Sequence, residues 1–243
     1  MSECGCQRKA PASSARPAES LSCRAVTEEP RVQVTTDGPY EVRNLPVAPG
    51  RIVKTDLGEP VEWEVGDPYP AGASIRLCRC GRSQTKPFCD DSHLDGFDGT
   101  EVADRTPTAE RRTQFPGNGL TLTDDISICS RAGFCKDEVS DAWERMDSVD
   151  DPDVREKVEA IVARCPSGRL VLIRNDGTPV EADFEPGIVV ERDGPYWVRG
   201  GVRIESSDGE PRESRNRVTL CRCGASGNKP YCDGTHEEIG FQG

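Results

Sequence analysis

Residues 78–93 read Cys78-Arg79-Cys80-Gly81-Arg82-Ser83-Gln84-Thr85-Lys86-Pro87-Phe88-Cys89-Asp90-Asp91-Ser92-His93. The same spacing, Cys-x-Cys-x8-Cys-x3-His, recurs at Cys221, Cys223, Cys232 and His236, and the two stretches contain both histidines of the chain. Thiolates and imidazole are common ligands of transition metals. A cysteine and a histidine four residues apart also share one helix face, about one turn apart. The spacing therefore predicts two equivalent metal sites.

The sequence before these stretches is also duplicated. Segment 37–43 (DGPYEVR) returns as 193–199 (DGPYWVR), and 58–60 (GEP) returns as 209–211. The offset between the copies falls from 156 to 143 residues, so the first copy carries 13 extra residues, which we expect in its loops. Each copy is predicted to form short strands joined by turns, followed by the cysteine segment.

Two helices and a strand are predicted between the copies. The first helix has apolar residues at i, i+3, i+4 and i+7, which are Val139, Ala142, Trp143 and Met146. The second is marked by Val154, Val158, Ile161 and Cys165. Asp151 is its expected N-cap, and Pro152 suits its first position. Leu170 to Ile173 follow as a short strand.

We therefore predict an α+β chain in which two small β-rich modules flank a small α/β insert. Hydrophobic residues make up only 34% of the chain and aromatic residues 5%, too few for one large core. Small modules held together by metal sites reconcile this composition with twelve cysteines. The expected parts are a disordered tail at 1–30, the first repeat at 31–100, a linker at 101–119, the insert at 120–175 and the second repeat at 176–243. The tail is rich in Ser, Ala, Pro and Glu, and its thiols, Cys4, Cys6 and Cys23, are expected to be incidental.

Charge and hydropathy argue against several classes of protein. A formal net charge of -12 disfavours nucleic acid and acidic membranes as partners. No apolar run approaches the roughly 20 residues of a membrane span, and the N-terminal sequence has no hydrophobic signal-peptide region. We therefore expect a cytoplasmic protein, in whose reducing compartment cysteines more often bind metal than form disulfides.

The stretch at 78–93 resembles the CDGSH iron–sulfur signature, C-x-C-x2-[ST]-x3-P-x-C-D-G-[ST]-H, of the mitoNEET-related family. The second stretch matches every position, and the first departs once, where Asp91 replaces Gly. Asp tolerates a left-handed backbone better than most residues, so we expect the first site to stay loaded, with altered stability. The resemblance implies one [2Fe-2S] cluster per motif. Its ligand pairs would be Cys78 with Cys80 and Cys89 with His93 in the first motif, and Cys221 with Cys223 and Cys232 with His236 in the second.

Other residues of the motifs are expected to support the clusters. Asp90 and Ser92, like Asp233 and Thr235, would cap the short helix that begins after the third cysteine. Lys86 and Lys229 are expected next to the clusters. The alternative is a pair of zinc sites, because three Cys and one His also form a good tetrahedral zinc set. The match at the Ser, Lys-Pro and Asp-x-[ST]-His positions favours iron–sulfur clusters, since a zinc finger needs none of these.

A third site is predicted in the insert. Cys129 and Cys135 are followed thirty residues later by Cys165 and Pro166, which resembles single-cluster bacterial ferredoxins. The position of their usual fourth ligand holds Ala132. Three cysteines suit a [3Fe-4S] cluster, or a [4Fe-4S] cluster whose fourth iron takes another ligand. The family of divergent single-cluster [4Fe-4S] domains also accompanies CDGSH modules. The alternative without a cluster is a small α/β domain with three buried thiols.

These sites favour electron transfer, or pH-sensitive cluster storage and transfer, over catalysis. Both histidines are accounted for as ligands, and the sequence has no Gly-rich phosphate loop and no nucleophile motif, so we expect no enzyme activity. The expected partners are redox proteins or apo cluster acceptors. We expect a monomer in which the two repeats can pack as an intramolecular pseudo-dimer. A redox- or iron-sensing interaction protein is the alternative function.

Overall fold

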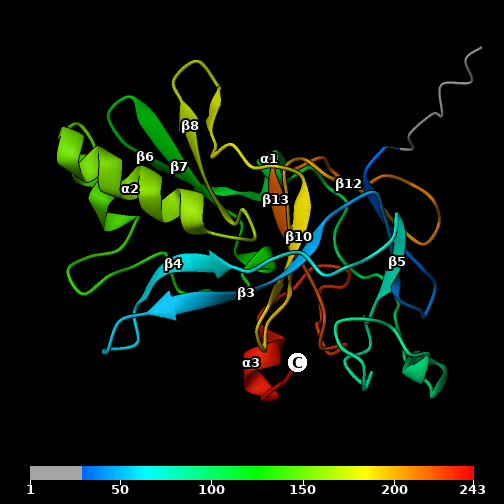
Figure 1. Cartoon of the computed structure of the whole chain (residues 1–243). Coiled ribbons are helices and arrows are strands. Elements are labelled where there is room, and N and C mark those ends of the chain that lie inside the picture. The colour runs from blue at the N-terminus through cyan, green and yellow to red at the C-terminus, as the bar shows by residue number, and fades with distance from the viewer. Residues whose placement is uncertain (1–28) are drawn as a thin grey trace, which may run out of the picture.

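The computed structural model describes residues 29–243, in which thirteen strands form three sheets and helices are few (Figure 1). The predicted α+β class is confirmed. The tail predicted for residues 1–30, with Cys4, Cys6 and Cys23, lies outside the described residues except for its last two positions.

The first sheet combines strands of both repeats. Its order is β12 (Arg203–Glu205), β1 (Arg31–Val34), β2 (Tyr40–Arg43) and β5 (Ser74–Leu77). β1, β2 and β5 are antiparallel neighbours from the first repeat. β12 comes from the second repeat and runs parallel to β1, with Ile204 opposite Val32. The first repeat is thus completed by a strand from the second.

The second sheet makes the converse exchange. Its order is β13 (Arg217–Leu220), β11 (Tyr196–Arg199), β10 (Gly187–Glu191), β3 (Val47–Lys54) and β4 (Pro60–Val65). β3 belongs to the first repeat and runs parallel to β10, with Val47 opposite Ile188. Alternate residues of a strand point to the same side of its sheet. Those on the inner sides of the first and second sheets form one apolar core shared by both repeats, which includes Val32, Tyr40, Ile188 and Tyr196.

The extra length of the first repeat enlarges the β3–β4 hairpin. These strands span eight and six residues, whereas the equivalent part of the second repeat has only three-residue β12 and a single bridge between Glu205 and Pro211. In Figure 1 the hairpin extends beneath α2. Trp63 of β4 donates from Nε1 to the carbonyl of Arg164, the last residue of α2 (Pro152–Arg164), at 3.1 Å. The extra residues of the first repeat were expected in loops. Some of them instead lengthen the β3–β4 hairpin, which contacts the insert.

The insert packs one helix against the third sheet. The sheet order is β6 (Thr113–Pro116), β7 (Leu120–Asp124), β8 (Leu170–Arg174) and β9 (Pro179–Val180). The second predicted helix is confirmed as α2 (Pro152–Arg164), with Pro at its start and the Asp151 side chain accepting from the Asp153 N–H. Val158 and Leu172 meet in the core of this domain.

The first predicted helix is wrong. Residues 144–148 form only a short 3-10 helix, η3 (Glu144–Ser148), and Val139 is 88% exposed. The Asp141 side chain accepts from the N–H groups of Trp143 and Glu144, so the turn starts later than the apolar spacing indicates. Ala142 and Met146 are nevertheless buried. The other short helices are η1 (Ser92–Leu94), α1 (Thr108–Arg111), η2 (Ile126–Ile128) and α3 (Thr235–Glu238).

Segment 101–119, expected as a linker, contains α1 and β6. Its Glu101 forms a buried ion pair with Arg212 at 2.7 Å, and Ala103 joins the core shared by the repeats. The third sheet extends past residues 120–175 at both ends, through β6 and β9. Within residues 29–243, no helix has the length and apolar character needed to cross a bilayer.

Candidate metal centres

Equivalent hydrogen bonds shape the loop of each CDGSH-like motif. Asp90 accepts from the Gln84 N–H through Oδ2 and from the Ser92 N–H and hydroxyl through Oδ1. Asp233 makes the same three bonds, to the Gly227 N–H and to Thr235. The expected capping role is corrected, because the N-cap positions of η1 and α3 are Asp91 and Gly234, and neither helix has a side-chain capping bond. The bonds of Asp90 and Asp233 instead order the turn just before each helix.

The two lysines act on the loops themselves. Lys86 donates from Nζ to the Ser83 carbonyl at 2.8 Å, and Lys229 donates to the Ser226 carbonyl at 2.9 Å. Both bonds lie within the segment between the second and third cysteines. The lysines thus brace the loop that carries the cysteines.

The donors of each motif lie in two close pairs. The Sγ atoms of Cys78 and Cys80 are 3.7 Å apart, and Cys89 Sγ lies 3.4 Å from Nδ1 of His93. In the second motif the equivalent distances are 3.8 Å for Cys221 and Cys223, and 3.3 Å for Cys232 and His236. Two ligands of one tetrahedral metal lie about 3.6–3.8 Å apart, given metal–ligand bonds of about 2.1–2.3 Å. Each pair is therefore spaced to hold one metal ion.

The two pairs of a motif do not surround a common point. Four ligands of a single ion would all lie within about 4 Å of one another, given the same bond lengths. Among the Cys, His, Asp and Glu side chains of residues 29–243, only one group of three or more places its ligand atoms within 4.8 Å of one another. That group is Cys89, Asp91 and His93, so the four expected ligands of a motif do not form such a group. A single tetrahedral zinc ion therefore does not fit the four expected ligands, whereas two metal ions held by separate pairs do.

Burial differs between the two motifs. Cys232 and His236 are 3% and 6% exposed, whereas Cys89 and His93 are half-buried. Burial raises the pKa of the Cys232 thiol and lowers the pKa of His236. The lowered pKa keeps the imidazole neutral, which is the form that binds a metal. The buried thiol remains protonated until a metal replaces the proton.

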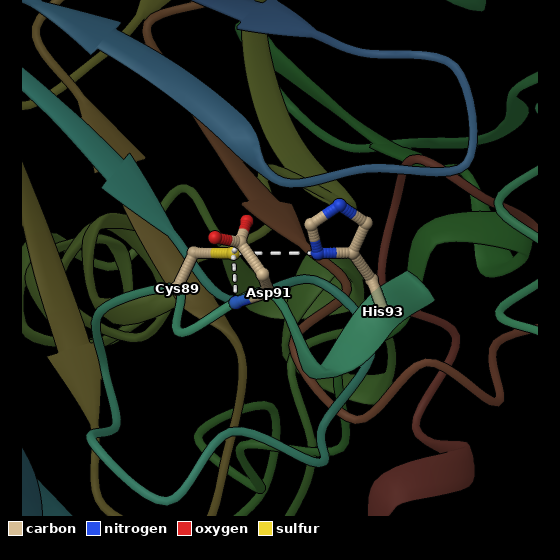
Figure 2. Close-up of side chains that lie close together, drawn as sticks. All are labelled: Cys89, Asp91 and His93. Carbon is tan, nitrogen blue, oxygen red and sulfur yellow. Dashed lines mark hydrogen bonds between the residues drawn. The ribbon is translucent and has the colours of Figure 1, made fainter. Parts of the chain in front are cut away.

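Asp91 adopts the backbone conformation expected for the glycine it replaces. Its φ is 69°, and that of the equivalent Gly234 is 88°. In both motifs the N–H of this residue points at the preceding cysteine, 3.4 Å from Sγ of Cys89 or Cys232. Figure 2 shows the Asp91 N–H and His93 Nδ1 both directed at Cys89 Sγ. The carboxylate of Asp91 is held by an ion pair with Arg76 at 2.6 Å.

The cysteine loops of the two motifs touch each other. A Cβ added to Gly81 would lie 2.5 Å from the carbonyl oxygen of Cys223, and one added to Gly224 would lie 2.6 Å from that of Cys80. Both glycines also have positive φ, 75° and 80°. The close approach therefore requires glycine at both positions.

The three cysteines of the insert line one small cavity. Cys129 and Cys135 lie in the loop after η2, and Cys165 follows the last residue of α2. Ala132 lines the same cavity, so no thiol stands at the fourth position. Burial raises the pKa of the Cys135 thiol. The structure thus brings the three predicted cysteines to one cavity. Within the described residues, their sulfur atoms do not all lie within 4.8 Å of one another, as the ligands of a single metal ion would.

Arg169 supplies positive charge at this third site. It donates from Nη1 to Sγ of Cys129 at 3.2 Å, and its Nε and Nη2 bond to the two carboxylate oxygens of Asp124 at 2.6 and 2.8 Å. The guanidinium also lies over the ring of Trp143, 5.2 Å from its centroid. Arg169 therefore links Cys129 to Asp124 and Trp143 and places a fixed positive charge beside the sulfur.

The third site adjoins the second motif. Arg131, in the loop between Cys129 and Cys135, forms an ion pair with Glu238 of α3. A Cβ on Gly234 would lie 2.6 Å from Cγ of Arg131. Asn228 donates to the Ser127 carbonyl at 2.8 Å, which adds a second bond between the two loops.

Several residues around the sites were not singled out from the sequence. Tyr40 and Tyr196 lie in the repeated DGPY segment, and Gly81 and Gly224 follow the repeated Cys-Arg-Cys, so duplication marked them without indicating their contacts. Arg169 carried no sequence signal beyond its place after Cys165-Pro166-Ser167-Gly168.

Comparison with family models agrees with this arrangement. The model described as iron-binding zinc finger, CDGSH type, matches residues 37–94 and 193–237. The model described as divergent 4Fe-4S mono-cluster matches residues 115–175. Neither the curated proteins nor the solved structures gave a match to the chain. The chain is therefore an iron–sulfur protein in which a divergent 4Fe-4S mono-cluster domain stands between two CDGSH-type iron-binding regions.

Proposed function

We propose that the protein is a carrier of electrons with three iron–sulfur clusters. The observation that carries the proposal is the separation of each motif's donors into two pairs, which suits two metal ions bridged within one cluster better than one zinc ion. Each motif would hold a [2Fe-2S] cluster. Such clusters supply one-electron redox chemistry when bound.

In the insert, Cys129, Cys135 and Cys165 would hold a [3Fe-4S] cluster, or a [4Fe-4S] cluster with a non-cysteine ligand near Ala132. The contacts between the three loops support a relay within one chain. The first and second loops meet at Gly81 and Gly224, and the third meets the second through Arg131 and Asn228. In this proposal the chain has no substrate of its own, and its partners are redox proteins.

Metal analysis of anaerobically purified protein tests the proposal. We expect iron and acid-labile sulfide with about seven or eight irons per chain, an estimate from the number of sites, together with visible absorption that bleaches reversibly on reduction. About four irons would support the two motifs and contradict the third cluster. Zinc without sulfide would overturn the electron-carrier proposal.

Release of a cluster from the first motif is a second candidate function. Cys89 and His93 are half-buried, whereas Cys232 and His236 are almost inaccessible. Protonation of a ligating histidine competes with iron, so acid should empty the first site before the second. We expect His93→Cys to remove most of this acid lability and His236→Cys to change it less. The rate of absorbance loss at low pH, with and without an apo acceptor protein, measures both; equal lability in the wild type and both variants would contradict this candidate.

A further inference from the structure

A cavity of about 360 Å³ opens beside the first motif and belongs to none of the proposed metal sites. Its walls come from β3 of the first repeat, from the end of β10 of the second, and from the loop at Lys86 and Pro87. This volume lies within the range of roughly 300–1,000 Å³ that is usual for small-molecule sites.

The lining of the cavity is basic, although the chain as a whole has a net charge of -12. The charged residues that line it are Arg51, Lys86, Arg192, Arg222 and one acid, Glu64. Tyr69 and Val190 add apolar surface between them. A basic cavity attracts small anions that can enter it. The acidic surface of the rest of the protein repels larger anions.

Arg222 lines the cavity, and two of its N–H donor atoms lack hydrogen bonds. The residue is 2% exposed, and its Nε and Nη2 atoms find no partner among residues 29–243. The nearby buried carboxyl of Glu191 does not satisfy it, because Oε2 of Glu191 is itself without a partner there. A buried guanidinium without an acceptor costs free energy, so an acceptor delivered by a ligand would be stabilising.

The first repeat shows how the equivalent arginine is normally satisfied. Arg79 donates from Nη1 to the Thr35 carbonyl at 3.0 Å and from Nη2 to the carbonyl of Gly99. The surroundings correspond closely, because Gly99 N–H bonds to Asp37 at 2.8 Å and Gly243 N–H bonds to Asp193 at 2.9 Å. Both arginines leave Nε without a partner, but only in the second repeat is Nη2 also left so. Gly243 lies against Nη2 of Arg222, but its carbonyl accepts from the Asp193 N–H at 3.2 Å and not from the guanidinium.

We propose that this cavity binds a small organic oxyanion, a phosphate or carboxylate carried on a flat apolar group, with the oxyanion on Arg222 and the group against Tyr69 and Val190. A guanidinium offers two parallel N–H donors that match the two oxygens of such a group. Arg192 and Arg51 stand at the more exposed edge, where the Arg51 side chain is 58% and the Arg192 side chain 75% exposed. The proposed site borders both motifs, at Lys86 and Arg222, but its lining includes none of the expected metal ligands.

Calorimetric titration of the holoprotein with phenyl phosphate, benzoate and the neutral analogue benzamide tests the proposal. We expect saturable binding of at least one anion and none of benzamide; whichever anion binds more tightly identifies the oxyanion. Arg192→Glu and Arg51→Glu should each weaken binding by about tenfold. Variants of Arg222 are avoided, because it lies between Cys221 and Cys223.

Two further variants keep this test specific. Arg105→Glu breaks an exposed ion pair with Asp208 at 2.7 Å, which matches the Arg51–Glu64 pair at 2.6 Å but lies outside the cavity lining. It should leave binding unchanged. The double variant R51E/E64R restores the ion pair and a cation at the rim, and should recover binding. Absence of saturable binding to the wild type, equal binding of benzamide, or equal weakening in Arg105→Glu would each overturn the proposal.

Discussion

The rings of Tyr40 and Tyr196 meet edge to face, with centroids 5.9 Å apart, and each hydroxyl reaches the cysteine loop of the opposite repeat. Tyr40 donates to the carbonyls of Cys221 and Pro230 at 2.9 and 3.1 Å. Tyr196 makes the reciprocal bonds to Cys78 and Pro87, at 2.8 and 3.0 Å. Each loop is therefore positioned by a strand of the other repeat, although all four expected ligands of each site lie within one repeat.

Replacing Tyr196 with Phe should weaken the first site. The change removes the hydroxyl donor from the buried carbonyl of Cys78, at a cost of about 1–3 kcal/mol. The Pro87 carbonyl also loses this donor but keeps its bond from the Cys78 N–H. We expect a lower free energy of unfolding in urea and, if the first motif holds the proposed cluster, faster loss of its visible absorbance. Tyr40→Phe should act in the same way on the second motif. Tyr69→Phe, whose ring packs against Phe88, is the control, and an equal effect of all three variants would refute a specific role for the crossed bonds.

Gly81→Ala and Gly224→Ala should separate the two loops. The added methyl groups would meet backbone carbonyl oxygens at 2.5 and 2.6 Å, and densely packed backbone cannot move aside without a large cost in free energy. We expect a loss of more than about 2 kcal/mol of stability, since positive φ adds about 1–2 kcal/mol to the steric overlap. The measurement is the urea midpoint of the holoprotein.

Gly58→Ala is the matched control for these two substitutions. Gly58 has φ +85°, yet a Cβ there would have no atom within 4 Å. Its cost should therefore be limited to about 1–2 kcal/mol of backbone strain. A Gly58→Ala variant as unstable as Gly81→Ala would show that strain, and not the contact between the loops, determines the effect.

The sequence indicated the repeats and the cysteine spacing because both are local patterns. The turn at 37–39 and the cap at Asp151 depend on neighbours a few residues away, and these expectations agree with the structure. The parallel pairings of β1 with β12 and of β3 with β10 join residues more than 130 positions apart. The short stretches that the two repeats share do not indicate which copy a strand will join, so the exchange could not be predicted from either repeat.

The failed helix around Val139 has a similar cause. The apolar spacing was correct for Ala142 and Met146, which are buried. Asp137 and Asp141, however, accept hydrogen bonds from backbone N–H groups two and three residues ahead. Such bonds compete with helix formation, and residues 137–143 are not helical. Asp137 and Asp141, near the apolar positions, could have indicated turns in place of a helix, but the apolar spacing does not take them into account.

Arg169→Leu should impair the third site and spare the other two. It removes the donor to Cys129 Sγ and leaves the half-buried carboxylate of Asp124 without its bidentate partner. We expect the iron content to fall by about three or four per chain, the content of one cuboidal cluster, while the absorbance of the other sites persists. Arg174→Leu, at the end of the same strand β8, is the control. A proportional loss of iron from all sites would instead indicate general unfolding.

Glu191 should make stability depend on pH. Burial raises its pKa to about 8; Arg222 and Lys54 oppose the shift, and Glu237 adds to it. In the unfolded chain the carboxyl ionises near 4.5, so between pH 4.5 and 8 the native state holds a proton that the unfolded state has lost. The native state is then disfavoured progressively as pH rises, by up to about 1.4 kcal/mol per pH unit, and the loss levels off above pH 8.

Glu191→Gln removes this penalty because the amide stays neutral. The free energy of unfolding, measured in urea at pH 6 and pH 8.5, should favour the variant over the wild type by more at the higher pH. Glu156→Gln, an exposed substitution on α2, should show no such widening. If the advantage of Glu191→Gln were the same at both pH values, Glu191 would already be ionised in the folded protein at pH 6. Arg222, the larger of the two nearby cationic influences, would then be its expected partner. That pairing would give Arg222 an acceptor within the chain, so this one measurement also bears on how much the basic cavity gains from a bound oxyanion.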